Sequence, residues 1–152
     1  MRLSEQLRPE MVLIGTDVAD RDELFDQLGH RLAELGEVRD GDDVIRRLRE
    51  REAILSTGIG GGVAVPHAQL PRLGRIVLAA STHPRGLDYP ALDGAPVHLV
   101  FCLLGDCDTT ADHLAGLARL ARLARRPDAV GELVASRTPD EFVAALDRLE
   151  SA

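Results

Sequence analysis

His67 has the most unusual setting of the five histidines in this 152-residue sequence. It directly follows Pro66 and an apolar run at residues 63–65. A stretch that contains Gly58 and the glycines at 60–62 precedes this run. Strand ends beside crossing loops are where open α/β sheets bind ligands, and glycines there let a phosphate or a partner's backbone approach closely. The pattern predicts one imidazole presented at the end of a strand.

The glycine-rich stretch matches neither of two common phosphate-binding motifs. It lacks the Gly-Lys-Ser/Thr ending of a P-loop, and it precedes a strand rather than a helix, unlike a dinucleotide fingerprint. All 18 basic residues are arginine, so Schiff-base and P-loop lysine chemistry are excluded. The glycines alone therefore carry no assignment.

Arg51 and His113 are two further candidates, and each also has an ordinary structural explanation. Arg51 falls in the last turn of an expected helix, where a cation interacts favourably with the helix C-terminus. His113 shares a helical face with Leu117, Leu120 and Ala124, which is typical of a buried core histidine. It also lies in the first turn, where unpaired N–H groups favour an anion. The residues alone leave both roles of His113 open.

The remaining histidines and the cysteines have simpler interpretations. We expect His30 on the polar side of a helix, His83 in a loop and His98 within a strand. Cys102 and Cys107 are too few for a disulfide framework and lack CxxC spacing, and Cys102 continues an apolar strand.

The elements that must position these residues follow from apolar periodicity and capping signals. The sequence predicts strands at 11–14, 63–65, 76–80 and 97–104, a glycine loop at 57–62 and an irregular crossing at 83–96. It predicts helices at 20–35, from a cap at Asp42 to about residue 54, from a cap at Thr109 or Thr110 to 125, at 128–136 and at 139–149 with Thr138 as cap. In the second helix, Ile54 is placed on the apolar stripe and Glu52 on the polar face. Helices before and after a central apolar sheet predict a three-layer α/β/α sandwich with a mixed, buried sheet, but not its strand order.

Composition limits the classes of partner. The formal net charge of −7 without a basic stretch argues against nucleic acid and anionic membrane surfaces. No apolar run approaches the roughly 18 residues of a membrane helix, and the N-terminus lacks a signal-peptide core. We expect a single domain over residues 1–152, located in the cytoplasm, with no membrane insertion.

Several of these residues match a known family. Arg51-Glu52, the segment 56–60, the segment Val-Ala-Val-Pro-His-Ala at 63–68 and later His113-Leu114 with Leu117-Ala118 resemble the type 2 enzyme IIA domains of the bacterial phosphoenolpyruvate-dependent phosphotransferase system. This family includes fructose, mannitol and nitrogen-regulatory IIA proteins. The resemblance covers essentially the whole chain, and the segment ending at Ala68 is its specific part. Three glycines at 60–62 replace a more usual single polar residue, and Ala68 stands where glycine is common.

The resemblance implies that His67 is phosphorylated by a histidine-containing carrier, HPr or its nitrogen-branch counterpart. Arg51 and His113 would hold the phosphoryl group, and a IIB component would receive it in fructose- or mannitol-like uptake. Alternatively, the phosphorylation state would govern binding to regulated target proteins. No cofactor or metal is expected, because phosphoryl transfer needs positioning and charge stabilisation, and His67 with His113 lacks the third ligand of a usual zinc site.

Overall fold

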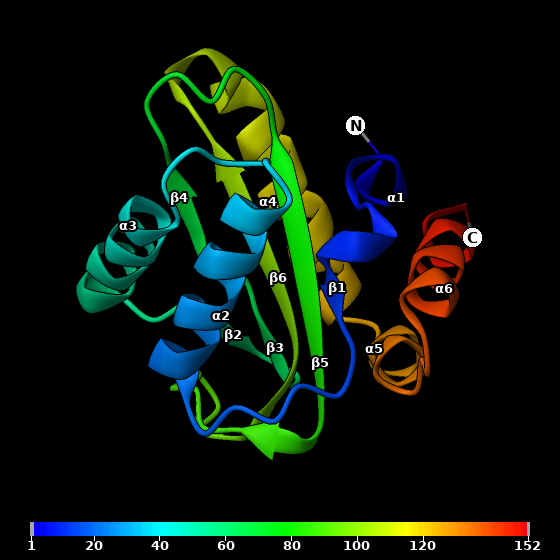
Figure 1. Ribbon diagram of the computed structural model, residues 1–152. Helices are drawn as coiled ribbons and strands as arrows, with labels where there is room; N and C mark the ends of the chain where they lie inside the picture. Colours follow the sequence, from blue (N-terminus) through cyan, green and yellow to red (C-terminus); the bar gives the residue numbers. More distant parts are fainter. Residues whose placement is uncertain (1, 152) are drawn as a thin grey trace.

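The computed structural model describes residues 2–151 and contains a mixed six-stranded sheet between two layers of helices (Figure 1). The predicted three-layer α/β/α architecture is confirmed. The helices are α1 (Leu3–Gln6), α2 (Arg21–Glu34), α3 (Gly41–Ile54), α4 (Thr110–Ala124), α5 (Pro127–Val134) and α6 (Pro139–Ser151), with 3-10 turns at Pro9–Met11 and Cys107–Thr109. The strands are β1 (Val12–Leu13), β2 (Gly58–Gly60), β3 (Val63–Ala64), β4 (His67–Gln69), β5 (Val77–Leu87) and β6 (Val97–Gly105).

Strand β6 is the centre of the sheet. The strand order is β1-β5-β6-β3-β2, and β4 pairs with β6 beyond the end of β3. β5 runs antiparallel to β6 with Leu78 opposite Leu103, whereas β3 and β4 run parallel to β6. Pairing on both edges and helices on both faces explain why β6 reads as a continuous apolar run.

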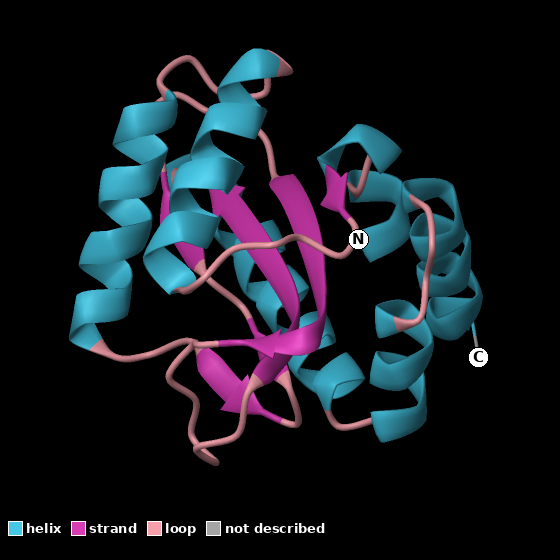
Figure 2. Ribbon diagram, turned by 60° about the horizontal axis from the view of Figure 1, so that its bottom comes forward, coloured by secondary structure: helices cyan, strands magenta, loops and turns pink. Residues whose placement is uncertain are grey.

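Helices α2 and α3 cover one face of the sheet, while α4 and α5 lie on the other (Figures 1 and 2). α2 begins at the expected place, because the Asp20 carboxylate accepts a hydrogen bond from Glu23 N at 2.9 Å. Its apolar residues Leu24, Phe25, Leu28 and Leu32 are buried, and Phe25 is fully enclosed. At the crossing of α2 and α3 a Cβ on Gly29 would lie 2.5 Å from Ile45 Cγ1, so only glycine permits this close approach.

Three boundaries differ from the prediction. The cap of α3 is Asp40 rather than Asp42, since its Oδ1 accepts from the Asp42 and Asp43 amides at 3.0 and 3.2 Å. β5 continues to Leu87 through the segment expected to be an irregular crossing. The predicted glycine loop includes strand β2, which forms an antiparallel hairpin with β3.

The three consecutive glycines turn the chain between β2 and β3. Gly60, Gly61 and Gly62 have φ values of 92°, 66° and 79°. This left-handed conformation is accessible to glycine at little cost and is strained for other residues. The backbone of the turn therefore accounts for the glycine run.

His83 lies in β5 and is buried, so its predicted loop location is wrong. Its Nε2 and the Ser81 hydroxyl are 2.8 Å apart, and its Nδ1 and the Thr16 hydroxyl are 3.2 Å apart. Burial, with a smaller contribution from His98, lowers the pKa of His83 to about 4. The neutral ring is thus part of the packed sheet.

We expect the free energy of unfolding to fall as the pH is lowered from about 6.5 to 4. In this pH range His83 binds a proton in the unfolded state, where its pKa is about 6.5, but stays neutral in the native state. Protonation therefore stabilises the unfolded state, and the free energy of unfolding falls by at most about 3 kcal/mol. Urea unfolding at pH 7 and pH 4.5 measures it. His83→Gln should reduce the pH dependence, whereas His30→Gln, at an exposed position, should not; equal slopes in all three proteins would contradict the assignment.

Candidate functional site

A break between β3 and β4 positions His67. Val65 N donates to Thr57 O at 3.0 Å, Pro66 has no N–H to donate, and Pro66 O accepts from Leu103 N at 3.0 Å. Pairing with β6 then resumes at His67, opposite Leu103. His67 is therefore the first residue of a second short strand, rather than the end of one strand as predicted.

The His67 ring is held in one tautomer. Nδ1 lies 2.8 Å from the Val65 carbonyl oxygen. A carbonyl can only accept, so the neutral ring carries its proton on Nδ1 and keeps a lone pair on Nε2. Burial, opposed by the Val65 hydrogen bond and aided by the nearby charge of Arg51, lowers the pKa of His67. The ring is then neutral at pH 7, with Nε2 able to act as a nucleophile.

His113, distant in sequence, lies against His67. The ring centroids are 5.6 Å apart and the planes meet at 65°. His113 is 5% exposed, and its pKa is lowered by burial and by His67. The structure thus brings together the two histidines that the sequence singled out.

The inner nitrogen of His113 lacks a hydrogen-bond partner among the described residues. This Nδ1 is buried, and a Cβ on Gly105 would lie 2.8 Å from it, so glycine is needed for the ring to fit. An acceptor nitrogen without a partner is less costly than a buried N–H without one. We therefore assign the proton of neutral His113 to Nε2.

Thr109 is the N-cap residue of α4, one of the two predicted, but its side chain makes no capping bond to the helix; Asp106 instead caps the 3-10 turn that leads into α4. Asp106 Oδ1 accepts from the Asp108 and Thr109 amides at 2.9 and 3.0 Å, and Thr109 Oγ1 accepts from Asp106 N at 2.8 Å. This capping box directly follows Gly105. It fixes the chain just before the helical turn that carries His113.

Arg51 lies in the last turn of α3 and is partly exposed. Its Nη1 donates to Leu55 O at 2.8 Å, which is the helix-end role noted from the sequence. Its charge also lowers the pKa of His67, so the guanidinium is within electrostatic range of that ring. Both explanations of Arg51 are therefore compatible with its position.

Glu52 is a buried carboxylate that the sequence analysis misplaced on the polar face. It is 6% exposed and accepts hydrogen bonds from Thr57 N at 3.1 Å and from the hydroxyls of Thr57 and Tyr89. Arg21 Nη1 is 3.6 Å from its Oε2. The signal was its spacing of four residues from the buried Leu48, which places both on one helical face.

Large apolar side chains are exposed next to the candidate residues. Ile54 and Leu55, just after Arg51, are 80% and 63% exposed, and Leu114, beside His113, is 60% exposed. The expectation that Ile54 belongs to the core is wrong. Exposed large apolar side chains are unusual on a protein surface where they form a patch, and such patches often contact another protein.

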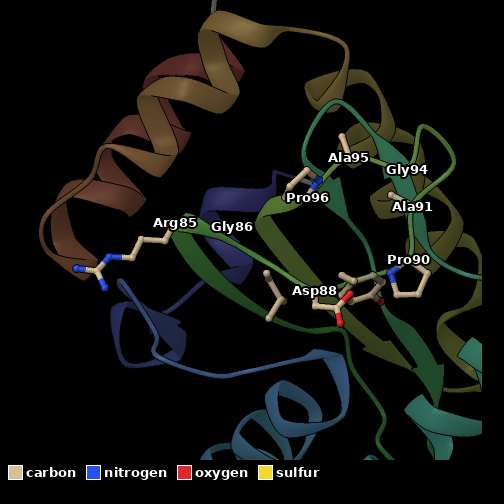
Figure 3. A pocket seen from close by; sticks show the side chains of 10 residues that line it. Arg85, Gly86, Asp88, Pro90, Ala91, Gly94, Ala95 and Pro96 are labelled. Atoms are coloured by element: carbon tan, nitrogen blue, oxygen red, sulfur yellow. The ribbon is translucent and has the colours of Figure 1, made fainter.

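A separate cavity of about 610 Å³ is lined by residues 85–91 and 94–96 (Figure 3). Arg85 extends away from it, and Asp88 is its carboxylate. Neither His67 nor His113 lines it. Tyr89, which donates to Glu52, lies in its wall. We therefore place the candidate site at the two histidines rather than in this cavity.

Among residues 2–151, no group of three or more His, Cys, Asp or Glu side chains is placed to hold a metal ion. None of the helices in the same range has the length and hydrophobicity needed to cross a membrane.

Comparison with known proteins identifies relatives of the whole described fold. The family model for the phosphoenolpyruvate-dependent sugar phosphotransferase system, EIIA 2, matches residues 5–149. A nitrogen regulatory protein of Bradyrhizobium diazoefficiens is 36% identical over 146 residues, covering 96% of this chain and 95% of that protein. The fructose-specific EIIABC component of Bacillus subtilis is 28% identical, over 94% of this chain and 22% of that protein.

A solved structure has the same fold. The nitrogen regulatory protein IIA-Ntr from Neisseria meningitidis superimposes with a TM-score of 0.87 at 28% identity, covering 95% of this chain and 98% of that one. Its match and that of the family model both extend over nearly all of the described residues. The chain therefore belongs to the EIIA 2 family of the phosphoenolpyruvate-dependent sugar phosphotransferase system.

Proposed function

We propose that this protein is a phosphohistidine carrier in which Nε2 of His67 accepts a phosphoryl group from an HPr-type carrier or its nitrogen-branch counterpart. A IIB component or a regulated target protein is the next partner. The observation that carries the proposal is the His67 ring, whose Nδ1–H is held by the Val65 carbonyl while His113 lies against it. Membership of a phosphotransfer family supports it.

The transfer needs no external base. The lone pair on Nε2 of His67 forms the new N–P bond while the N–P bond in the donor phosphohistidine breaks, and the donor nitrogen keeps that electron pair. The His67 ring retains its Nδ1 proton and becomes a phosphoimidazolium, while the donor imidazolium becomes neutral. The Val65 carbonyl stabilises the positive charge that develops on the His67 ring.

Arg51 and His113 are the proposed phosphoryl ligands. A guanidinium has forked donors that suit phosphate oxygens, and Arg51 need only rotate away from its Leu55 carbonyl contact. Nε2–H of His113 provides a neutral donor that adds no competing positive charge beside His67. Positioning and charge stabilisation of this kind are the main requirements of phosphoryl transfer.

The second partner separates two versions of the function. Uptake of a fructose- or mannitol-like sugar requires transfer from His67 to a IIB component, and the fructose-specific EIIABC relative favours this version. The nitrogen regulatory relatives, one of which matches with high coverage on both sides, favour a regulatory output instead. Exposed Ile54, Leu55 and Leu114 provide an apolar contact surface in either case.

Reconstitution tests the proposal. The protein is incubated with phosphoenolpyruvate, enzyme I and either the HPr-type or the nitrogen-branch carrier, and its mass and acid lability are measured. We expect one acid-labile phosphate per chain. No labelling with either carrier would overturn the proposal. Transfer of the phosphate to a IIB component would support the uptake version, whereas selective capture of a target protein by the phosphorylated form would support the regulatory version.

We expect Arg51→Ala to slow phosphorylation about tenfold, a loss of about 1.4 kcal/mol of transition-state stabilisation. The same change should raise the pKa of His67, because Arg51 lowers it. Phosphorylation quenched at successive times gives the rate, and NMR titration gives the pKa of His67. Arg49→Ala is the matched control, since Arg49 is exposed on the same helix and pairs with Asp26. A rate for Arg51→Ala equal to that of the control would remove Arg51 from the site.

A further inference from the structure

A continuous series of hydrogen bonds links the buried Glu52 to the nucleophile. The Glu52 carboxylate holds both the backbone N–H and the hydroxyl of Thr57. Thr57 O accepts from Val65 N at 3.0 Å, and Val65 O accepts from Nδ1 of His67 at 2.8 Å. Thr57 and Val65 are each held through the N–H and make the next link through the carbonyl of the same residue, so each link restrains the residue that makes the next one.

The far side of Glu52 is also fixed. Tyr89 donates its hydroxyl to the carboxylate, and Arg21 approaches it at 3.6 Å. Burial and the adjacent Glu52 raise the pKa of Tyr89, so its phenol remains a donor. A buried carboxylate with three hydrogen-bond donors and a cation beside it is an anchored group with little freedom to rotate.

The reaction needs what this series provides. Phosphoryl transfer depends on a nucleophile aligned with the donor phosphorus, and a small misplacement of reacting atoms costs orders of magnitude in rate. Only the tautomer with the proton on Nδ1 leaves Nε2 free to attack, and only a correctly aimed Val65 carbonyl selects that tautomer. The negative charge of Glu52 also favours the cationic ring that forms during transfer.

We propose that Glu52 is a positioning residue for the phosphoryl-transfer site, which acts through Thr57 and Val65 to hold His67 with Nε2 free. The proposal rests on the function proposed for His67, but the geometry it concerns exists before any phosphate arrives. Glu52 touches neither reactant, so its contribution is orientation and a fixed negative charge close to the ring. Its effect can therefore be measured with and without transfer.

The first experiment uses ¹⁵N NMR of the histidine rings in the unphosphorylated full chain. Wild type should show His67 protonated on Nδ1 at neutral pH, and Glu52→Gln should increase the share of the Nε2–H tautomer. The groups facing His67 are Arg51 and Glu52 from α3 and His113 from α4, and removing the one negative charge among them should move the His67 titration to lower pH. A merely structural role would change neither.

The second experiment measures the rate of phosphorylation by the carrier. We expect Glu52→Gln to be about tenfold slower than wild type, and Tyr89→Phe about threefold slower because the carboxylate keeps its Thr57 contacts. The single variant Thr57→Ser retains both hydrogen-bond donors to Glu52, so its rate should be close to that of wild type. Glu50→Gln is the matched control, since Glu50 is exposed two residues earlier on the same helix and pairs with Arg46.

The outcomes are distinguishable. If the folded Glu52→Gln protein has the wild-type tautomer, titration and rate, the positioning role is overturned. If Glu52→Gln does not fold, wild-type tautomers and rates in both Tyr89→Phe and Thr57→Val would overturn it instead. Absence of phosphorylation in the wild type would overturn the proposed function alone, because the NMR comparison still decides what Glu52 does to the ring.

Discussion

Replacement of His67 by alanine is expected to abolish phosphorylation of the chain. With Nε2 of His67 removed, we expect no other histidine to replace it. His113 has its Nδ1 buried and its proton assigned to Nε2, His83 is buried within β5, His98 lies near the glycine turn, and His30 lies exposed on α2. Mass spectrometry after incubation with phosphoenolpyruvate, enzyme I and the carrier should show one phosphate on wild type and none on His67→Ala. The wild-type phosphate should be lost in acid, as expected of an N–P bond.

His98→Ala is the control for this experiment. His98 is also a partly buried strand histidine, with its Nδ1 2.9 Å from the His83 carbonyl oxygen, but it lies near the glycine turn rather than beside His113. The His98→Ala protein should accept phosphate at the wild-type stoichiometry. A phosphate that persists in a folded His67→Ala protein would show that the acceptor is another residue.

The second large effect is expected at His113. His113→Ala removes the ring that lies against His67 and its proposed phosphoryl donor. It should slow phosphorylation by tenfold or more, because a charge-assisted hydrogen bond to the transferring group is worth about 1.5 to 3 kcal/mol. It also empties a space in the interior, so stability should fall by about 1 to 3 kcal/mol. Rates are therefore compared at a temperature where urea unfolding shows both proteins to be fully native.

A second substitution separates donor loss from cavity formation. His113→Gln can place an amide N–H near the position of Nε2 and should recover part of the rate that His113→Ala loses. His30→Ala, at an exposed position, should leave the rate unchanged. If His113→Gln and His113→Ala were both as fast as wild type, His113 would be a core residue without a part in transfer.

The sequence predicted the layers better than it predicted the boundaries. Long amphipathic or continuously apolar stretches, such as α2 and β6, depend on periodicity that local sequence displays directly. The extension of β5 through Pro84 and Gly86 could not be predicted, because those residues signal a break. Pairing with β6 is interrupted after Thr82 and resumes at Leu87, opposite Val97. Strand order likewise depends on long-range pairing that has no local signature.

The candidate site was predictable in part for the same reason. His67 was visible because Pro66 and the neighbouring glycines mark an unusual backbone, and His113 because its helical position suggested a buried polar ring. Glu52 was hidden among charged residues, where a buried carboxylate looks like one more member of a solvated face. Its partners Thr57 and Tyr89 are 5 and 37 residues away along the chain, and only the fold brings Tyr89 close.

The two chain ends are joined by direct contacts. Glu150 accepts from the Leu3 and Ser4 amides, both at 2.8 Å, and Arg2 bonds to the Asp147 side chain, on the side of the sheet away from β4 (Figure 1). A short peptide joining the ends should therefore allow circular permutation, with new termini opened at an exposed turn such as Pro71–Arg72. A label attached next to α1 or at the end of α6 would lie on the side of the sheet away from β4 and would not obstruct the histidines (Figure 1).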